Sequence, residues 1–194
     1  MIAADTKITA YEYAKLAHLN VFRPVQRGKR PKGVAVKGSW DGVPVEVLMW
    51  EQLCPRDQDL YLYLCHLATH QNHRKIDAVK DTELEHKGDY SKMHTCTVKA
   101  SGYHLTKIIY GDNSARNYKL LWESLRRLGT THVIFASKTN QESLTSLIGY
   151  TRNEDAVEIS INPLSALLLL GDKVGYVRYN LQDRFNLPPN TARL

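Results

Sequence analysis

The stretch "SARNYKLLWESLRRLG", residues 114–129, has the periodicity of a single amphipathic helix that ends at a glycine. Apolar side chains recur at three- and four-residue steps and predict one buried face: Tyr118, Leu121, Trp122, Leu125 and Leu128. The opposite face carries charges: Arg116, Lys119, Glu123 and Arg127. This pattern fits a core helix with an ordinary solvated face. It fits equally well a helix that enters a groove of DNA.

The residues before this helix predict a second, shorter one. "GYHLTKIIYG", residues 102–111, predicts a helix ended by Gly111, and "DNS", residues 112–114, supplies turn and capping side chains. "TCTVKAS", residues 95–101, alternates like a short strand. Further upstream, "CPRDQDLYLYLCHLATHQ" predicts a helix with Pro55 in its first turn. Its core-facing stripe is expected at four positions: Leu60, Leu64, Leu67 and Ala68.

A β-hairpin is predicted to follow the longer helix. "THVIFASK" (131–138) and "LTSLIGYTR" (144–152) are its expected strands, and "AVEISI" (156–161) is a third. Short helix, turn, longer helix and hairpin are the order of a winged helix-turn-helix, with the hairpin as the wing. The predicted fold class is therefore α+β, a three-helix cluster with a wing; a generic α+β domain is the alternative.

The N-terminal part of the chain predicts looser organisation. "TAYEYAKLAHL" (9–19) is expected to form a short helix, and "FRPVQRGKRPKG" (22–33) a basic loop, because prolines and glycines disfavour regular structure. Asp41-Gly42 predicts the turn of an additional hairpin over about residues 34–50. Residues 72–93, which are polar and of mixed charge, predict a long surface loop.

We therefore expect three parts along the chain: an arm with the basic loop (1–33), a first winged-helix domain (34–172), and a connector with the start of a possible second domain (173–194).

Composition favours a cytoplasmic protein. The 194 residues are 43% hydrophobic and carry a formal net charge of +6, which suits an anionic partner without requiring one. The start of the chain lacks the pattern of a secretory signal, and no apolar run approaches the length of a membrane span. Three cysteines do not complete an even disulfide framework, so reduced thiols are expected.

No metal, cofactor or catalytic centre is expected. Cys65, His66, His70 and His73 lie close in sequence but complete no four-ligand zinc pattern, so a buried thiol with exposed histidines is the simpler interpretation. The phosphate-loop, dinucleotide, zinc-protease and serine-hydrolase motifs are missing. A tyrosine-dependent nicking enzyme would need a His-x-His pair, which does not occur; Tyr61 and Tyr63 are instead expected to flank the helix core.

DNA binding has more support, because a protein that contacts phosphates needs cations along one surface. The candidates lie in the basic loop, at the start and on the charged face of the longer helix, and on the predicted wing: Arg23, Arg27, Lys29, Arg30, Lys32, Asn113, Ser114, Arg116, Asn117, Lys119, Arg127 and Lys138. For each of them, a solvated surface side chain is the alternative. We expect alanine at Arg116 or Arg127 to weaken DNA binding without loss of the fold.

The order of these segments resembles the plasmid replication initiators of the RepC type, found on IncQ-like plasmids, and more loosely the TrfA-like initiators. The matching segments are "LNVFRPVQRGKRPKG", "DGVPVEVLMWEQLCPRDQDLYLYLCHLA", "TVKASGYHLTKIIYGDNSARNYKLLWESLRRLGTTHV", "VEISINPLSALLLLGDKVGYVRYN" and "LPPNTARL". The resemblance implies two winged-helix domains, binding to repeated sites (iterons) in double-stranded origin DNA, recruitment of a replicative helicase, a homodimer, and no cofactor.

The chain departs from that family where "LPPNTARL" opens a helix and stops, whereas the family continues into a second domain. The chain is expected to be either a fragment of such an initiator or a short family member with a single domain. If it is a fragment, sequence-specific binding to iterons is not expected of it, and dimerisation becomes the expected surviving activity. "SINPLSALLLLGD" (160–172) is then either a core helix or, with the strand at 157–161, part of a dimer surface. The competing functions are a winged-helix transcriptional regulator, and a dimerisation or helicase-recruiting module with weak DNA affinity.

Overall fold

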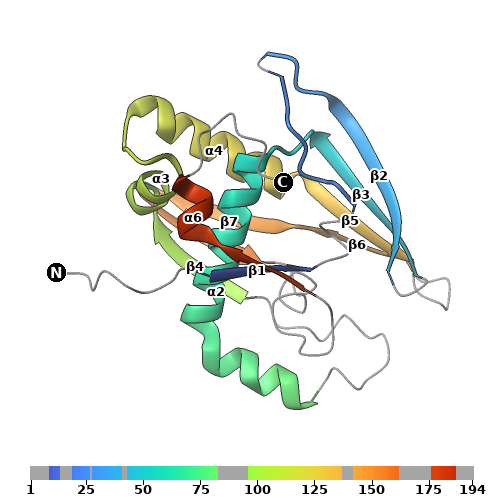
Figure 1. The fold of residues 1–194 in the computed structure, drawn as a ribbon. Coiled ribbons are helices and arrows are strands. Elements are labelled where there is room, and N and C mark those ends of the chain that lie inside the picture. The colour runs from blue at the N-terminus through green and yellow to red at the C-terminus, as the bar shows by residue number, and fades with distance from the viewer. Residues whose placement is uncertain are drawn as a thin grey trace.

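The computed structural model describes the backbone of residues 9–13, 19–26, 28–40, 43–82, 96–136, 142–161 and 176–186. Within these ranges the chain forms helices α2, α3, α4 and α6 and nine strands in three antiparallel sheets (Figure 1). None of the described helices is long and apolar enough to cross a membrane.

Three helices form the cluster that the sequence predicted: α2 (Pro55–Thr82), α3 (Gly102–Tyr110) and α4 (Ala115–Gly129). Helix α3 ends as expected at Gly111, whose φ of 86° is a conformation that glycine adopts without strain. Helix α4 begins after its N-cap Ser114, also as expected. Its last helical residue is Gly129, and Thr130 serves as the C-cap.

Strands β4 (Cys96–Ser101), β7 (Ile148–Asn153) and β8 (Ala156–Ile161) form the sheet beside these helices, in the order β4-β8-β7. The hairpin that accompanies α3 and α4 is therefore β7–β8, which lies beside them in Figure 1 as the wing. With the helix cluster it makes the winged-helix fold that the sequence predicted.

The prediction of residues 144–152 as one continuous wing strand is wrong. The segment is divided at Leu147 into β6 (Glu142–Ser146) and β7, which belong to different sheets. Leu147 and Ile148 are both buried, so the alternation of a strand breaks here and the chain changes the face it presents to the core. The amide of Leu147 donates to the carbonyl of Thr131 at 2.9 Å and fixes the break.

The larger sheet has the order β2-β3-β5-β6 and is built from two hairpins. Strands β2 (Lys32–Trp40) and β3 (Val43–Glu51) confirm the hairpin predicted over residues 34–50; the Asp41-Gly42 turn lies outside the described residues. Strand β5 (Thr131–Ala136) joins β6 to β3. Alternate side chains from these strands fill the core: Val36, Val45, Val47, Met49 and Val133.

The two ends of the described chain pair with each other. Strand β1 (Thr9–Tyr13) runs antiparallel to β9 (Tyr176–Asn180), and the short helix α6 (Leu181–Asn186) follows directly (Figure 1). The helix predicted over residues 9–19 is thus wrong for residues 9–13. "TAYEY" is rich in residues that favour strands, and its partner "YVRYN" lies far away in sequence, where local periodicity cannot reveal it.

Helix α2 differs from its prediction in length and in burial. It continues to Thr82, so the surface loop predicted for residues 72–93 is wrong over residues 72–82; the remainder lies outside the described residues. All nine residues from Asp57 to Cys65 are buried, so burial extends beyond the predicted stripe, of which Leu67 is only half-buried. The reason is that α2 is contacted by two strands, β1 and β4, and by three helices, α3, α4 and α6.

Strand β8 includes residues 157–161, which were predicted as part of a dimer surface. Both of its edges are occupied, by β4 and by β7, so its backbone offers no free edge to a second chain. Residues 162–175, which include most of "SINPLSALLLLGD", lie outside the described residues.

Candidate nucleic-acid interface

The first turn of α4 is capped by its own side chains. Asp112 Oδ1 accepts hydrogen bonds at 2.8 Å from the amide of Ser114 and from Nδ2 of Asn117. Ser114 Oγ accepts from the amide of Asn117 at 3.4 Å. The hydrogen bond from the Ser114 amide lowers the pKa of Asp112, which stays ionised. An ionised carboxylate therefore lies beside the helix start, where its charge opposes the binding of a phosphate, and Ser114 and Asn117 already serve in the cap.

The exposed face of α4 carries its cations beyond this cap. Arg116, Lys119 and Arg126 are exposed, in line with half-exposed Glu123. The first two were predicted from the sequence, whereas Arg126 was not. Steps of three, four and three residues from Arg116 lead to Lys119, Glu123 and Arg126, so the helical period held the signal.

Arg127 is not on that face, and the expectation that it is solvated is wrong. It is 7% exposed, and its Nη2 donates to Asp57 Oδ1 at 2.8 Å and to Ser124 Oγ at 2.9 Å. Burial lowers the pKa of Arg127, but the Asp57 carboxylate outweighs burial and the net pKa is raised. A guanidinium held in this way faces the core, so it cannot reach a phosphate while the fold is intact.

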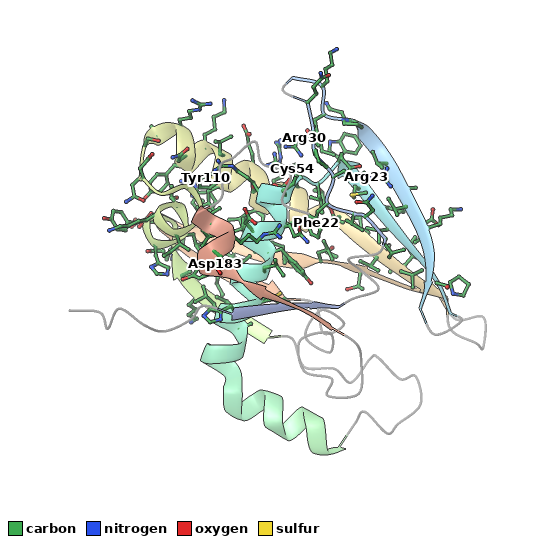
Figure 2. All side chains as sticks on the ribbon, viewed as in Figure 1. Phe22, Arg23, Arg30, Cys54, Tyr110 and Asp183 are labelled. Carbon is green, nitrogen blue, oxygen red and sulfur yellow. The ribbon has the colours of Figure 1, made fainter. Side chains whose placement is uncertain are left out.

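The basic loop, residues 22–33, begins at Phe22, bridged to Leu53, and passes into β2 at Lys32. Arg23, Lys29 and Lys32 are exposed, and Arg27 lies outside the described residues. Arg30 turns inward and lies beside Cys54 near the start of α2 (Figure 2). Of the four described cations of the loop, three are therefore exposed to solvent and one, Arg30, is turned inward.

The cation that the wing presents is not the predicted one. Lys138 lies outside the described residues, between β5 and β6 of the larger sheet. On β7 of the wing, the guanidinium of Arg152 lies 4.2 Å from the centre of the Trp122 ring of α4. Arg152 is the last residue of the predicted wing strand 144–152 but was not among the predicted DNA-binding residues, because the sequence gives no sign of its contact with Trp122. Asn113, the remaining candidate, is half-buried.

The residues considered for other chemistry are mostly interior. Tyr61 and Tyr63 are buried, as expected, and the Tyr63 hydroxyl lies 2.7 Å from Nε2 of His104. Cys65 is buried, and His66 stacks on Tyr63. The side chains of His70 and His73 are not among those that the structure describes. Among the described residues, no group of three or more His, Cys, Asp or Glu side chains is placed to hold a metal ion.

No curated protein sequence matches this chain. Among solved structures, a crystal structure of RctB domains 2-3 (RctB-155-483) matches with a TM-score of 0.47 and 10% identity over 80% of this chain and 58% of that chain. A second crystal structure, of selenomethionine derivatives of domain 2 and domain 3 of RctB, matches with a TM-score of 0.49 and 12% identity. This match covers 89% of this chain and 64% of that chain. The chain spans less than two thirds of the length of either structure. The model of the family described as Initiator Replication protein, WH1, matches residues 58–192, and the chain belongs to this family of replication initiators.

Proposed function

We propose that this chain binds double-stranded DNA at a plasmid replication origin, as an initiator of the RepC or TrfA-like type, and that it acts without catalysis. The observation that carries the proposal is the line of exposed cations on α4 of a winged-helix fold, Arg116, Lys119 and Arg126. In winged-helix proteins the corresponding helix approaches the duplex. Repeated origin sites, a replicative helicase and a second copy of the chain are the partners proposed with it.

The geometry favours contact with phosphates over direct reading of bases. The amide-bearing side chain near the helix start, Asn117, is bonded to Asp112, whereas the cations are exposed along α4 from Arg116 to Arg126. Contacts to phosphate position a protein on DNA but carry little sequence information. We therefore propose that this domain supplies affinity and register.

The test is a titration of duplex DNA at several salt concentrations, with the molecular mass determined in the same buffers. Each cation that neutralises a phosphate adds about 0.9 to the slope of log affinity against log salt. Arg116→Ala and Lys119→Ala should each lower the slope by about 1 and weaken all sequences equally. Lys37→Ala is the matched control, because Lys37 is an exposed cation of β2 paired with Glu46.

The possible outcomes separate the alternatives. Salt-dependent binding that prefers repeated origin sites supports an initiator, whereas preference for a single operator supports a transcriptional regulator. A dimeric mass without DNA affinity supports a dimerisation or helicase-recruiting module. Covalent attachment of DNA to a tyrosine would contradict the proposal that the chain is not an enzyme.

A further inference from the structure

Two arginines from distant parts of the chain meet on one carboxylate. Asp57 lies in the first turn of α2, and its side chain is fully buried. Nε and Nη2 of Arg127 donate to its Oδ1 at 3.1 and 2.8 Å. Nη1 of Arg30 lies 3.4 Å from its Oδ2, which also accepts from the amide of Cys54 at 2.9 Å. Helix α4 and the basic loop are thus tied to the two oxygens of a single side chain.

Arg30 fastens the loop by more than this ion pair. The same Nη1 donates to the carbonyl of Gln52, and Nη2 lies 3.6 Å from Sγ of Cys54. The backbone holds the loop at its two ends, where the Arg23 amide donates to Leu53 and the Gln52 amide donates to Pro31. Arg30 is therefore a side-chain anchor between those ends.

The anchor lies between two groups of exposed cations. Lys29 and Lys32 of the loop are exposed on either side of Arg30, and Arg126 of α4 is exposed next to Arg127. In each element, one cation reaches inward to Asp57 while its neighbours face solvent. The position of the outward cations of the loop relative to those of α4 is thereby fixed through Asp57.

We propose that Asp57 is a positioning residue for DNA binding: it holds the basic loop against α4, so that their exposed cations act as one phosphate-binding surface. The proposal rests on the proposed function and deepens it. Arg30 is then an anchor and contacts no phosphate. Without the anchor, the cost of ordering the loop around Gly28 opposes its contact with DNA, so Lys29 no longer neutralises a phosphate.

The experiment compares Arg30→Gln and Arg30→Lys with Lys29→Gln in the same salt titration of duplex DNA. Lysine keeps the charge of Arg30 but loses the planar fork that reaches Gln52 and Asp57 together. Lys29→Gln removes one outward cation and should lower the slope by about 1. Both Arg30 variants should lower the slope by about 1, the share of Lys29, because Lys32 is held in β2 by the pairing of that strand with β3. Lys29→Gln added to Arg30→Gln should lower the slope no further.

Hydrogen exchange of the free protein provides a second measurement that does not depend on DNA. The Gln52 and Arg23 amides should exchange faster in both Arg30 variants and remain unchanged in Lys29→Gln. Two results would show that Arg30 is an ordinary phosphate contact and would overturn the positioning role alone. One is a double variant whose slope loss equals the sum of the losses of Arg30→Gln and Lys29→Gln. The other is an Arg30→Lys variant with the wild-type slope. A wild-type chain without salt-dependent binding would overturn the proposed function as well.

Discussion

The two halves of α4 carry similar charges and have different environments. In the N-terminal half, Arg116 and Lys119 extend into solvent beyond a self-contained cap. In the C-terminal half, Arg127 is buried on Asp57 and hydrogen-bonds Ser124. The spacing of the residues gives no sign of this change, because Arg127 lies four residues from Glu123 and eight from Lys119.

The difference comes from the neighbouring helix. The first turn of α2 presents Asp57 to the end of α4, and a buried carboxylate needs a cation close by. The start of α4 packs against no buried carboxylate: its described acidic partners are Asp112 in its own cap and Asp155, which accepts from the Tyr118 hydroxyl at 3.5 Å, and both hydrogen bonds are exposed. Arginine therefore stabilises the fold at position 127, where it meets Asp57, and remains available for a ligand at positions 116 and 126, which are exposed.

The largest expected effect is the loss of Arg127. Arg127→Ala leaves Asp57 buried with Arg30 as its remaining arginine partner, and we expect the free energy of unfolding to fall by about 3–5 kcal/mol. Urea unfolding followed by circular dichroism measures this change. Arg116→Ala is the matched variant from the other half and should change the free energy by less than about 0.5 kcal/mol. Equal effects of the two substitutions would contradict the distinction between the halves.

A smaller effect is expected from Tyr110, whose hydroxyl lies 3.3 Å from Ser124 Oγ in the C-terminal half. Burial raises the pKa of Tyr110 from 10.0 to about 12, so the folded state favours the neutral phenol. The stabilisation is fully present below about pH 10 and is lost as the pH rises towards 12. By linkage, unfolding should become easier by roughly 2–3 kcal/mol across that range.

Stability curves of the wild type and Tyr110→Phe between pH 8 and about 12 isolate this contribution. The variant keeps the ring and lacks the titrating group, so its curve should be flatter above pH 10. Parallel curves for the two proteins would show that Tyr110 ionises as readily in the folded chain as in the unfolded one.

The smallest expected effect is at the N-terminal cap. Ser114→Ala removes the acceptor of the Asn117 amide and should cost about 0.5–1 kcal/mol, towards the low end because Asp112 still caps the turn. Thermal unfolding measures the loss, and Ser114→Asn should restore most of it. A loss as large as that of Arg127→Ala would mean that this half of α4 is as dependent on tertiary contacts as the other.

Much of the fold was predictable because its signals are local. Residues 102–129 contain a complete helix–turn–helix with Gly111 and Ser114 at the ends of the two helices, and both helices were predicted with the right bounds. The hairpin β2–β3 followed from Asp41-Gly42 and the β-branched residues on either side of it. Short-range periodicity and turn chemistry suffice for such elements.

The candidate site was predictable only in part. The exposed positions Arg23, Lys29, Lys32, Arg116 and Lys119 were named from sequence, and their role in DNA binding remains a prediction. Arg152 lies in the predicted wing strand 144–152 but was not named, because its contact with Trp122 of α4 appears only once helix and wing are brought together by folding. Arg30 was predicted as an outward cation of the basic loop, but its side chain is turned inward to Asp57 and Cys54.

The sequence by itself determined where most of the helices and hairpins form and that the chain carries an excess of cations. Only the tertiary structure decided which cations remain in solvent, since Arg30 and Arg127 turn inward to Asp57 and Arg184 to Asp59. The physical reason is that helical and strand periods are set by neighbours in the chain, whereas burial of a charge depends on a partner brought close by folding. Those partners lie 27, 70 and 125 residues away.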